Sequence, residues 1–239
     1  MQSPFANMPP VVKNLLIINI IFYIATFALA KLINLNELLA AYYPFSPAFR
    51  PWQIVTYMFM HDPSNIAHIL FNMFALFSFG PMLEYTLGSK KFFNYYFITG
   101  IGAYVLYMAV QAIQIHAIAG AYTIPNPGIE ASYFNYGGQE NAQKLYSYFN
   151  FPMMGASGAI FGILVGFAML FPNLEMMIMF IPVPIKAKYV VIGYIAIELF
   201  SGIGRFAGDN VAHFAHLGGA LFGFLLIKLW GIKRPNNFY

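Results

Sequence analysis

The sequence contains no cysteine and very little charge. The lack of cysteine excludes disulfide bonds, cysteine nucleophiles and thiolate metal ligands. Charged residues make up 8% of the 239 residues, whereas soluble domains carry about 25%. A water-facing surface cannot be covered at that charge density, and 60% of the residues are hydrophobic. The composition therefore predicts an integral membrane protein.

Two further signals are absent. No cleavable signal peptide is evident, because the first apolar run, from Leu15 to Ile33, is longer than the apolar core of such a peptide. The net charge is +4, but the basic residues are scattered along the chain rather than clustered. We therefore expect the lipid bilayer as a partner, and no nucleic acid.

What the chain does contain is a set of six apolar segments. They lie near residues 12–33, 65–84, 92–116, 154–171, 188–204 and 211–231. A helix that crosses a bilayer needs about 20 residues, so the fourth and fifth segments are short. The pattern predicts an all-α membrane protein, a bundle of six transmembrane helices in one domain covering residues 1–239.

The connections between these segments differ in composition. Residues 34–64 contain four prolines and many aromatic residues, which is typical of a loop in the membrane interface. Residues 117–153 form a polar insertion in which residues 139–148 have an amphipathic helical pattern. Residues 181–184, Ile-Pro-Val-Pro, predict an extended run.

The distribution of basic residues predicts an orientation. Eight of the twelve Lys and Arg residues fall in segments on the side of the N-terminus, and four fall on the other side. Cytoplasmic loops carry the excess of Lys and Arg, so we expect both termini to be cytoplasmic. The second, fourth and sixth segments then enter from the outer side.

Polar residues lie at the start of these three segments, where polar groups in lipid are functional candidates. They are His68 and Asn72, the run Gly155-Ala156-Ser157-Gly158, and the run Ala215-His216-Leu217-Gly218-Gly219. In the predicted orientation, all three groups lie about 5–10 Å below the outer boundary. A hydroxyl, two imidazoles and an amide at one depth indicate a single site.

Ser157 is the candidate nucleophile. Gly155 and Gly158 beside it allow the backbone to approach closely, and the Ser157 amide at a helix N-terminus can donate to an oxyanion. His68 and Asn72 are one helical turn apart, and both can donate hydrogen bonds to the same oxyanion.

His216 is the candidate general base, because an imidazole can take the serine proton and return it to the leaving amine. Gly219 and Gly223 follow on the same helix face and permit close contact with the fourth segment. Phe161 lies one turn after Ser157 and is placed to stack against the His216 ring. Each residue also has a structural interpretation: a serine cap, a histidine satisfied within the bundle, or core packing.

Neither a metal nor a carboxylate partner is evident. His213 lies one turn before His216, but no third ligand is convincing, so we expect no metal and no cofactor, and a supporting role for His213. Asp209 is expected in the outer loop. Glu198, inside the fifth segment, is either structural or lines a substrate gate. These residues predict a Ser–His dyad whose histidine is oriented by packing.

The order and spacing of these motifs resemble the rhomboid family of intramembrane serine proteases, of the compact six-helix bacterial type. The resemblance also includes Trp52 in the first loop and Glu84 with Gly88 at the end of the second segment. Two positions depart from it: Gln53 follows Trp52 where the family often has Arg, and Phe161 stands where Tyr is frequent.

The resemblance implies that Ser157 is the nucleophile and His216 the base, and that His68, Asn72 and the Ser157 amide form the oxyanion site. It also implies single-span transmembrane proteins as substrates, cleaved near the outer face of a bacterial cytoplasmic membrane. The fifth segment and its neighbouring loops are then expected to form a lateral gate.

Two other functions are compatible with parts of the sequence. A catalytically silent rhomboid-like protein would bind membrane clients, but such proteins generally lack a catalytic residue, and here both Ser157 and His216 are present. A small transporter would place polar groups at several depths and usually contain an internal repeat, whereas the sequence has its polar cluster on one side and no evident repeat.

Overall fold

The computed structural model describes residues 8–178, 181–204 and 212–235. Each predicted apolar segment coincides with an α-helix. These helices are α1 (Pro10–Ala28), α4 (Ile66–Leu87), α5 (Ser89–Ala119), α7 (Ser157–Leu170), α8 (Ala187–Gly204) and α9 (His213–Leu229). The predicted segment boundaries differ from the helix ends by up to five residues.

Four of these helices, α1, α4, α5 and α8, are long and apolar enough to cross a membrane, by length and composition alone. The apolar helices α7 and α9 are shorter, with 14 and 17 residues. The prediction of a short fourth segment is therefore confirmed. Helix α8, with 18 residues, is also below the about 20 residues needed to cross a bilayer, as predicted for the fifth segment, and α9, which begins at His213, has 17 residues.

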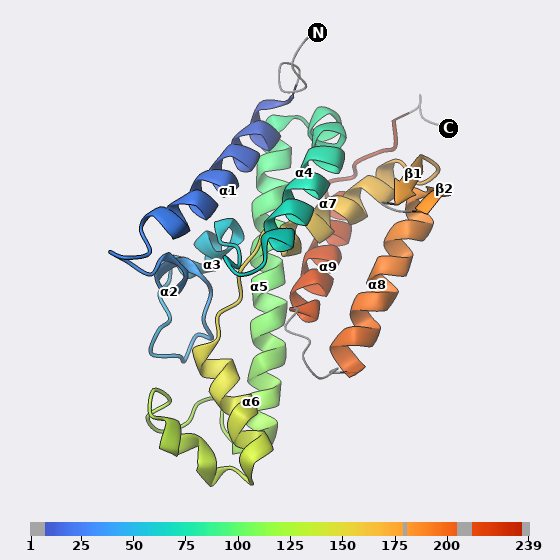
Figure 1. Cartoon of the computed structure of the whole chain (residues 1–239). Coiled ribbons are helices and arrows are strands. Elements are labelled where there is room, and N and C mark those ends of the chain that lie inside the picture. Colours follow the sequence, from blue (N-terminus) through green and yellow to red (C-terminus); the bar gives the residue numbers. More distant parts are fainter. Residues whose placement is uncertain (1–7, 179–180, 205–211, 236–239) are drawn as a thin grey trace.

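The helices are arranged around α5, which runs through the length of the molecule (Figure 1). Helices α7 and α9 pack against α5 and against each other, while α1 and α8 lie at opposite edges of the bundle. The first turn of α1 and the last turn of α9 lie at one end, and α6 (Gln139–Asn150) lies at the other. We call the latter the α6 end.

The connections contain short elements. The loop after α1 holds α2 (Leu35–Leu39), α3 (Gln53–Thr56) and the 3₁₀ helix η1 (Tyr57–Phe59), and the insertion holds the 3₁₀ helix η2 (Glu130–Asn135) and α6. The predicted amphipathic helix at 139–148 is confirmed as α6. The predicted extended run is part of β2 (Ile181–Lys186), which pairs antiparallel with β1 (Glu175–Ile178).

The first loop is organised by one buried amide. The Gln53 side chain is fully buried, accepts from the Arg50 amide at 3.0 Å and donates to the Ala48 carbonyl at 3.2 Å. The neighbouring Trp52 indole donates to the Leu38 carbonyl at 2.9 Å. Gln53, which departs from the family pattern, thus makes its own network of backbone contacts and ties together distant parts of the loop.

Glycines allow α7 and α9 to pack with their backbones in contact. A Cβ atom on Gly219 would overlap the carbonyl oxygen of Gly158, and one on Gly223 would lie 2.8 Å from the Cα of Gly162. Small residues permit this kind of close helix approach in membranes. The packing brings the first turns of α7 and α9 side by side.

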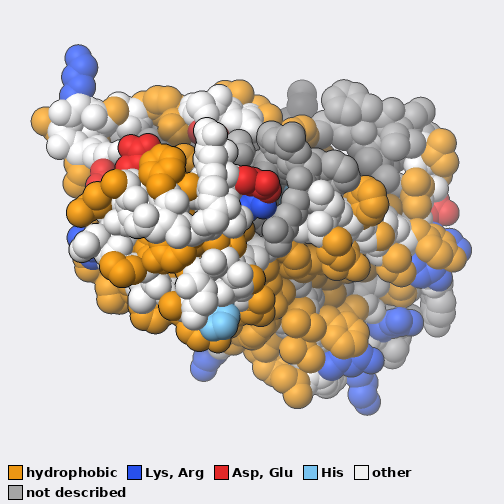
Figure 2. Space-filling model, turned by 90° about the horizontal axis from the view of Figure 1, so that it is seen from below, with side chains coloured by type: hydrophobic (Ala, Val, Ile, Leu, Met, Phe, Trp, Pro, Cys, Tyr) orange, Lys and Arg blue, Asp and Glu red, His pale blue; other side chains and the backbone are white. Residues whose placement is uncertain are grey.

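Large apolar side chains cover the outer faces of the peripheral helices. On α8, Ile197, Phe200 and Ile203 are each at least 60% exposed. Seen from the α6 end, hydrophobic side chains cover much of the visible surface and charged ones are few (Figure 2). Such a surface would be an association hazard in water but is suited to lipid.

Candidate active site

The two central residues meet across the contact between α7 and α9. The Ser157 Oγ atom lies 2.8 Å from the His216 Nε2 atom, which is a hydrogen-bonding distance. Ser157 is the first residue of α7, and His216 is in the first turn of α9 with 9% of its surface exposed. A hydroxyl and an unprotonated imidazole nitrogen at this distance can exchange a proton.

The segment before Ser157 is fixed by its backbone. Gly155 has a φ of +127°, and its amide donates to the Tyr57 carbonyl at 3.0 Å. A Cβ atom at Gly155 would lie 2.7 Å from the His68 Nε2 atom. Both the conformation and the space therefore require glycine at this position.

Phe161 stacks against the base. Its ring is nearly parallel to the His216 ring, with an interplanar angle of 8° and 4.4 Å between centroids. Phe161 is on α7, one turn after Ser157, so the same helix positions both residues. The stacking restricts rotation of the imidazole away from Ser157.

The proposed oxyanion donors lie on α4. His68 borders Gly155, and its Nδ1 atom is 3.5 Å from the Asp62 amide, a long contact in which Nδ1 accepts. This tautomer leaves the proton on Nε2, which faces the segment before Ser157. Asn72 is buried, and its side-chain nitrogen donates to the His68 carbonyl at 2.8 Å. One of its two N–H groups is thus used within α4, and the other is left for a ligand.

A carboxylate that the sequence did not assign to the site lies beside both histidines of α9. The Glu198 Oε2 atom, on α8, is 2.6 Å from the His213 Nδ1 atom and 2.9 Å from the His216 Nδ1 atom. The second distance is that of an ion pair, but Nδ1 of His216 makes no aligned hydrogen bond. The expectation that packing alone orients His216 is therefore wrong, because a carboxylate also contacts its ring.

The signal for this contact was present in the sequence as an acidic residue inside an apolar segment. What the sequence did not reveal was which helix faces which, so Glu198 had no partner. Asp209, the acid expected in the outer loop, lies outside the described residues. Glu198 also supplies the third ligand-type side chain that was missing beside His213 and His216.

A further histidine is buried beside the site. His61 has no exposed surface, its ring centroid is 5.1 Å from that of His68, and neither ring nitrogen has a hydrogen-bond partner among the described residues. Burial, reinforced by His68, lowers the pKa of His61 to about 3. The His61 ring is therefore neutral near pH 7.

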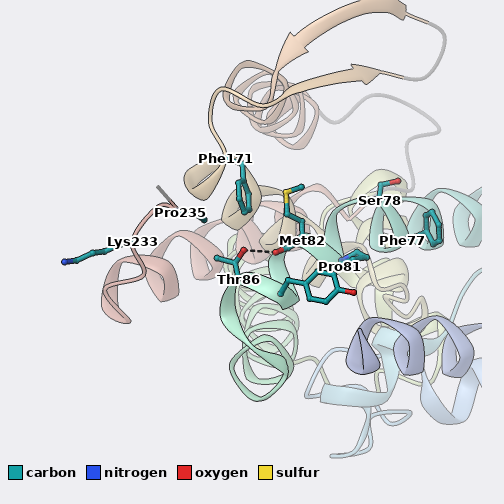
Figure 3. A pocket seen from close by; sticks show the side chains of 9 residues that line it. Phe77, Ser78, Pro81, Met82, Thr86, Phe171, Lys233 and Pro235 are labelled. Carbon is teal, nitrogen blue, oxygen red and sulfur yellow. Dashed lines mark hydrogen bonds between the residues drawn. The ribbon is translucent and has the colours of Figure 1, made fainter. Parts of the chain in front are cut away.

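A separate pocket of about 790 Å³ lies at the opposite end of α4. Its lining includes Pro81 and Thr86 of α4, Phe171 after α7, and Lys233 (Figure 3). The Thr86 hydroxyl donates to the Met82 carbonyl at 2.8 Å. Among the described residues that line this pocket there is no His, Asp or Glu, so these residues offer no base for a nucleophile.

Comparison with known proteins identifies the family. The model of the Rhomboid domain matches residues 48–232. The chain therefore belongs to the rhomboid family, whose members are membrane-embedded and generally intramembrane serine proteases.

Three curated relatives span fungi and bacteria. The chain is 28% identical to Rhomboid protein 1, mitochondrial, of Saccharomyces cerevisiae over 66% of this chain and 36% of that protein. It is 28% identical to an uncharacterised mitochondrial rhomboid protein of Schizosaccharomyces pombe, over 87% of this chain and 56% of that protein. It is 29% identical to Rhomboid protease GluP of Bacillus subtilis, over 78% of this chain and 27% of that protein.

These matches bear on two expectations. The chain spans between about a quarter and about a half of the length of these relatives. The expected location in a bacterial cytoplasmic membrane is not supported, since two of the relatives are mitochondrial.

Proposed function

We propose that the chain is an intramembrane serine endopeptidase that cleaves single-span transmembrane proteins near the membrane face at the α6 end. The observation that carries the proposal is the 2.8 Å contact between Ser157 Oγ and His216 Nε2. Family membership supports protease chemistry in general, and this contact supplies its nucleophile and base.

The first step is attack by serine. Nε2 of His216 accepts the proton of the Ser157 hydroxyl while Oγ forms a bond to the substrate carbonyl carbon. The carbonyl oxygen becomes an oxyanion, which the Ser157 amide, His68 Nε2–H and the free Asn72 N–H are placed to bind. The imidazolium of His216 then gives its proton to the leaving amine, and water releases the acyl group by the reverse sequence.

Two groups position the base. Phe161 holds the plane of the imidazole by stacking, and the negative charge of Glu198 beside Nδ1 stabilises the imidazolium. A proton on Nδ1 faces Glu198 and leaves the Nε2 lone pair directed at Ser157. In this role Glu198 acts through His216 and does not contact the substrate.

Helix α8 is suited to a lateral gate. It lies at the edge of the bundle (Figure 1) and packs on α9, α7 and β2. It also carries exposed apolar side chains, which are suited to lipid. A substrate helix cannot be cut while its backbone is fully hydrogen-bonded in lipid. Movement of α8 would let an unwound segment reach Ser157 from the bilayer.

The test is cleavage of a reporter transmembrane substrate in proteoliposomes. We expect the wild-type chain to cut the reporter, and the Ser157→Ala variant to leave it intact. The fold of the variant is checked by its thermal unfolding midpoint. A Ser157→Ala variant that still cuts would end the assignment of the nucleophile. An inactive wild-type chain with the same reporter would favour the catalytically silent alternative.

A further inference from the structure

Three nitrogen and oxygen donors converge on one small volume between α8 and α9. The Nδ1 atoms of His213 and His216 lie 2.6 Å and 2.9 Å from the same oxygen, Oε2 of Glu198. All three ligand atoms lie within 4.8 Å of one another. The three side chains are 11–13% exposed, so the site is shielded but remains reachable.

The two histidines are spaced for joint ligation. They are three residues apart in the first turn of α9, and their rings are nearly perpendicular, at 88°. Their Nδ1 atoms nevertheless face one carboxylate oxygen from the neighbouring helix. The Nδ1 atom of His216 is buried and makes no aligned hydrogen bond, so it can bind a metal ion when the ring proton moves to Nε2.

The donor set suits zinc. Two imidazole nitrogens and a carboxylate oxygen, with a fourth position left to water, form a common three-ligand zinc site. In a tetrahedral site the ligand atoms are separated by about 3.4 Å, from Zn–N and Zn–O bonds of about 2.1 Å. The two Nδ1–Oε2 distances, 2.6 Å and 2.9 Å, need to increase by less than about 1 Å to reach this separation. Mg²⁺ prefers six oxygen ligands and is a poor fit.

We propose that Glu198, His213 and His216 form an inhibitory site for Zn²⁺ or a similar divalent transition-metal ion. The inference deepens the proposed function and rests on His216 being its base. A metal on Nδ1 of His216 occupies the lone pair of that nitrogen. The single proton of the neutral imidazole must then reside on Nε2, the atom that has to accept the proton of Ser157.

The same carboxylate therefore has two effects. With a proton on Nδ1, Glu198 favours the tautomer in which Nε2 faces Ser157 as a base. With a metal between them, the imidazole is locked in the opposite tautomer, and Nε2–H can only donate to the Ser157 oxygen. Metal binding thus blocks proton transfer without displacing either catalytic side chain.

The first experiment measures binding without protease activity. The Ser157→Ala chain, purified in detergent and stripped of metal, is titrated with Co²⁺, and the visible absorption of a tetrahedral Co²⁺ complex is recorded. We expect one equivalent per chain, displaced by Zn²⁺. The signal is lost when Glu198→Gln or His213→Gln is added and is retained with His116→Gln, a histidine at the far end of α5. His213→Ala is the second variant if His213→Gln does not fold.

The second experiment measures inhibition. Zn²⁺ is expected to slow reporter cleavage by the wild-type chain, EDTA to restore it, and Mg²⁺ to have no effect. Each variant is compared with its own metal-free rate. The half-inhibitory Zn²⁺ concentration rises about tenfold or more in His213→Gln, since loss of even a supporting group weakens zinc sites by that factor, and is unchanged in His116→Gln.

Two results overturn the inference. One is a Ser157→Ala chain that binds no Co²⁺ or Zn²⁺, or that binds it equally well after His213→Gln and Glu198→Gln. The other is an unchanged zinc sensitivity in His213→Gln. Failure of the protease assignment can be told apart from failure of the metal site. A chain that cleaves nothing but binds metal through these three residues would retain the proposed metal site, and only the inhibitory role of that site would be lost.

Discussion

At the scale of single residues, the site depends on how the His216 ring is held. Ser157 is in front of Nε2, Glu198 is beside Nδ1, and Phe161 covers one face of the ring. Each contact comes from a different direction, so together they leave the imidazole little freedom. Two of the three contacts are made by α7, which ties the position of the base to that of the nucleophile.

Removal of the stacking ring tests this arrangement. We expect Phe161→Ala to lower kcat about tenfold, because an aromatic contact contributes about 0.5–1.5 kcal/mol beyond the area it buries. Phe161→Tyr keeps the ring and is expected to retain activity. The measurement is the kcat for reporter cleavage by the two variants. Equal kcat values for Phe161→Ala and the wild-type chain would contradict the role of the ring.

The buried His61 predicts a dependence of stability on pH. Its pKa is about 3 in the folded chain and 6.5 when exposed, so below pH 6.5 the unfolded chain binds a proton that the folded chain does not. The contribution of His61 to stability is therefore present above pH 6.5 and is lost progressively as the pH falls toward about 3.

We expect the apparent unfolding midpoint of the wild-type chain in detergent to fall between pH 7 and pH 5. His61→Gln should reduce this fall, and His116→Gln, at an exposed position, should leave it as it is. The same acid sensitivity in His61→Gln and the wild-type chain would show that His61 is not the cause.

At the scale of elements, glycines set the distance between the two helices that carry the catalytic pair. Gly219 faces the Gly158 carbonyl, with no space for a methyl group, whereas a Cβ atom at Gly193 in α8 would meet nothing within 4 Å. These two glycines therefore form a matched pair, in which only one is needed for packing.

We expect Gly219→Ala to separate α7 from α9, to destabilise the chain by about 3 kcal/mol and to abolish cleavage. Gly193→Ala should be neutral or stabilise the chain by up to about 1 kcal/mol, because alanine is the better helix former. The measurements are the unfolding midpoint and the cleavage rate of both variants. A Gly219→Ala chain as active as Gly193→Ala would refute close packing as the requirement.

The first turn of helix α1 is capped by a carboxylate from another element. Glu84, buried near the end of α4, accepts from the Val11 and Val12 amides at 3.1 Å and 2.8 Å and from the Ser89 hydroxyl at 2.7 Å. The first turn of α1 has no side-chain cap of its own. Glu84 thus satisfies free amides at a positive helix end and explains why an acid is tolerated there.

The sequence predicted elements better than contacts between them. Apolar runs of 17 to 25 residues gave the positions of all six apolar helices, because in a low-charge chain such runs are distinct from their surroundings. The motif residues Ser157 and His216 were also identifiable from their position at helix starts. Glu198 was not assigned, because its partners depend on how α8 faces α9, and no local pattern encodes that rotation.

At the scale of the whole molecule, the arrangement predicts an orientation in the membrane. Lys90 and Lys91 lie at the start of α5, at the end opposite α6, and Lys144 lies on α6. Basic residues are in excess near the end opposite α6, which favours placing that end on the cytoplasmic side of the membrane. The proposed active site then opens on the other side of the bilayer.

The absence of cysteine makes this orientation easy to test. Single cysteines are introduced as Lys91→Cys and Lys144→Cys and treated with a membrane-impermeant thiol reagent in intact cells. We expect Lys144→Cys to be labelled at once and Lys91→Cys only after the membrane is permeabilised. The reverse pattern would show that the chain is inserted in the opposite direction.

The central claim is that Ser157 is an activated nucleophile and that His216 is its base. The most direct measurement is labelling of the purified chain with a fluorophosphonate, followed by mass spectrometry of the modified peptide. We predict a single adduct on Ser157 in the wild-type chain and none in His216→Ala with the fold intact. An adduct on another residue, or undiminished labelling of Ser157 in His216→Ala, would contradict the account.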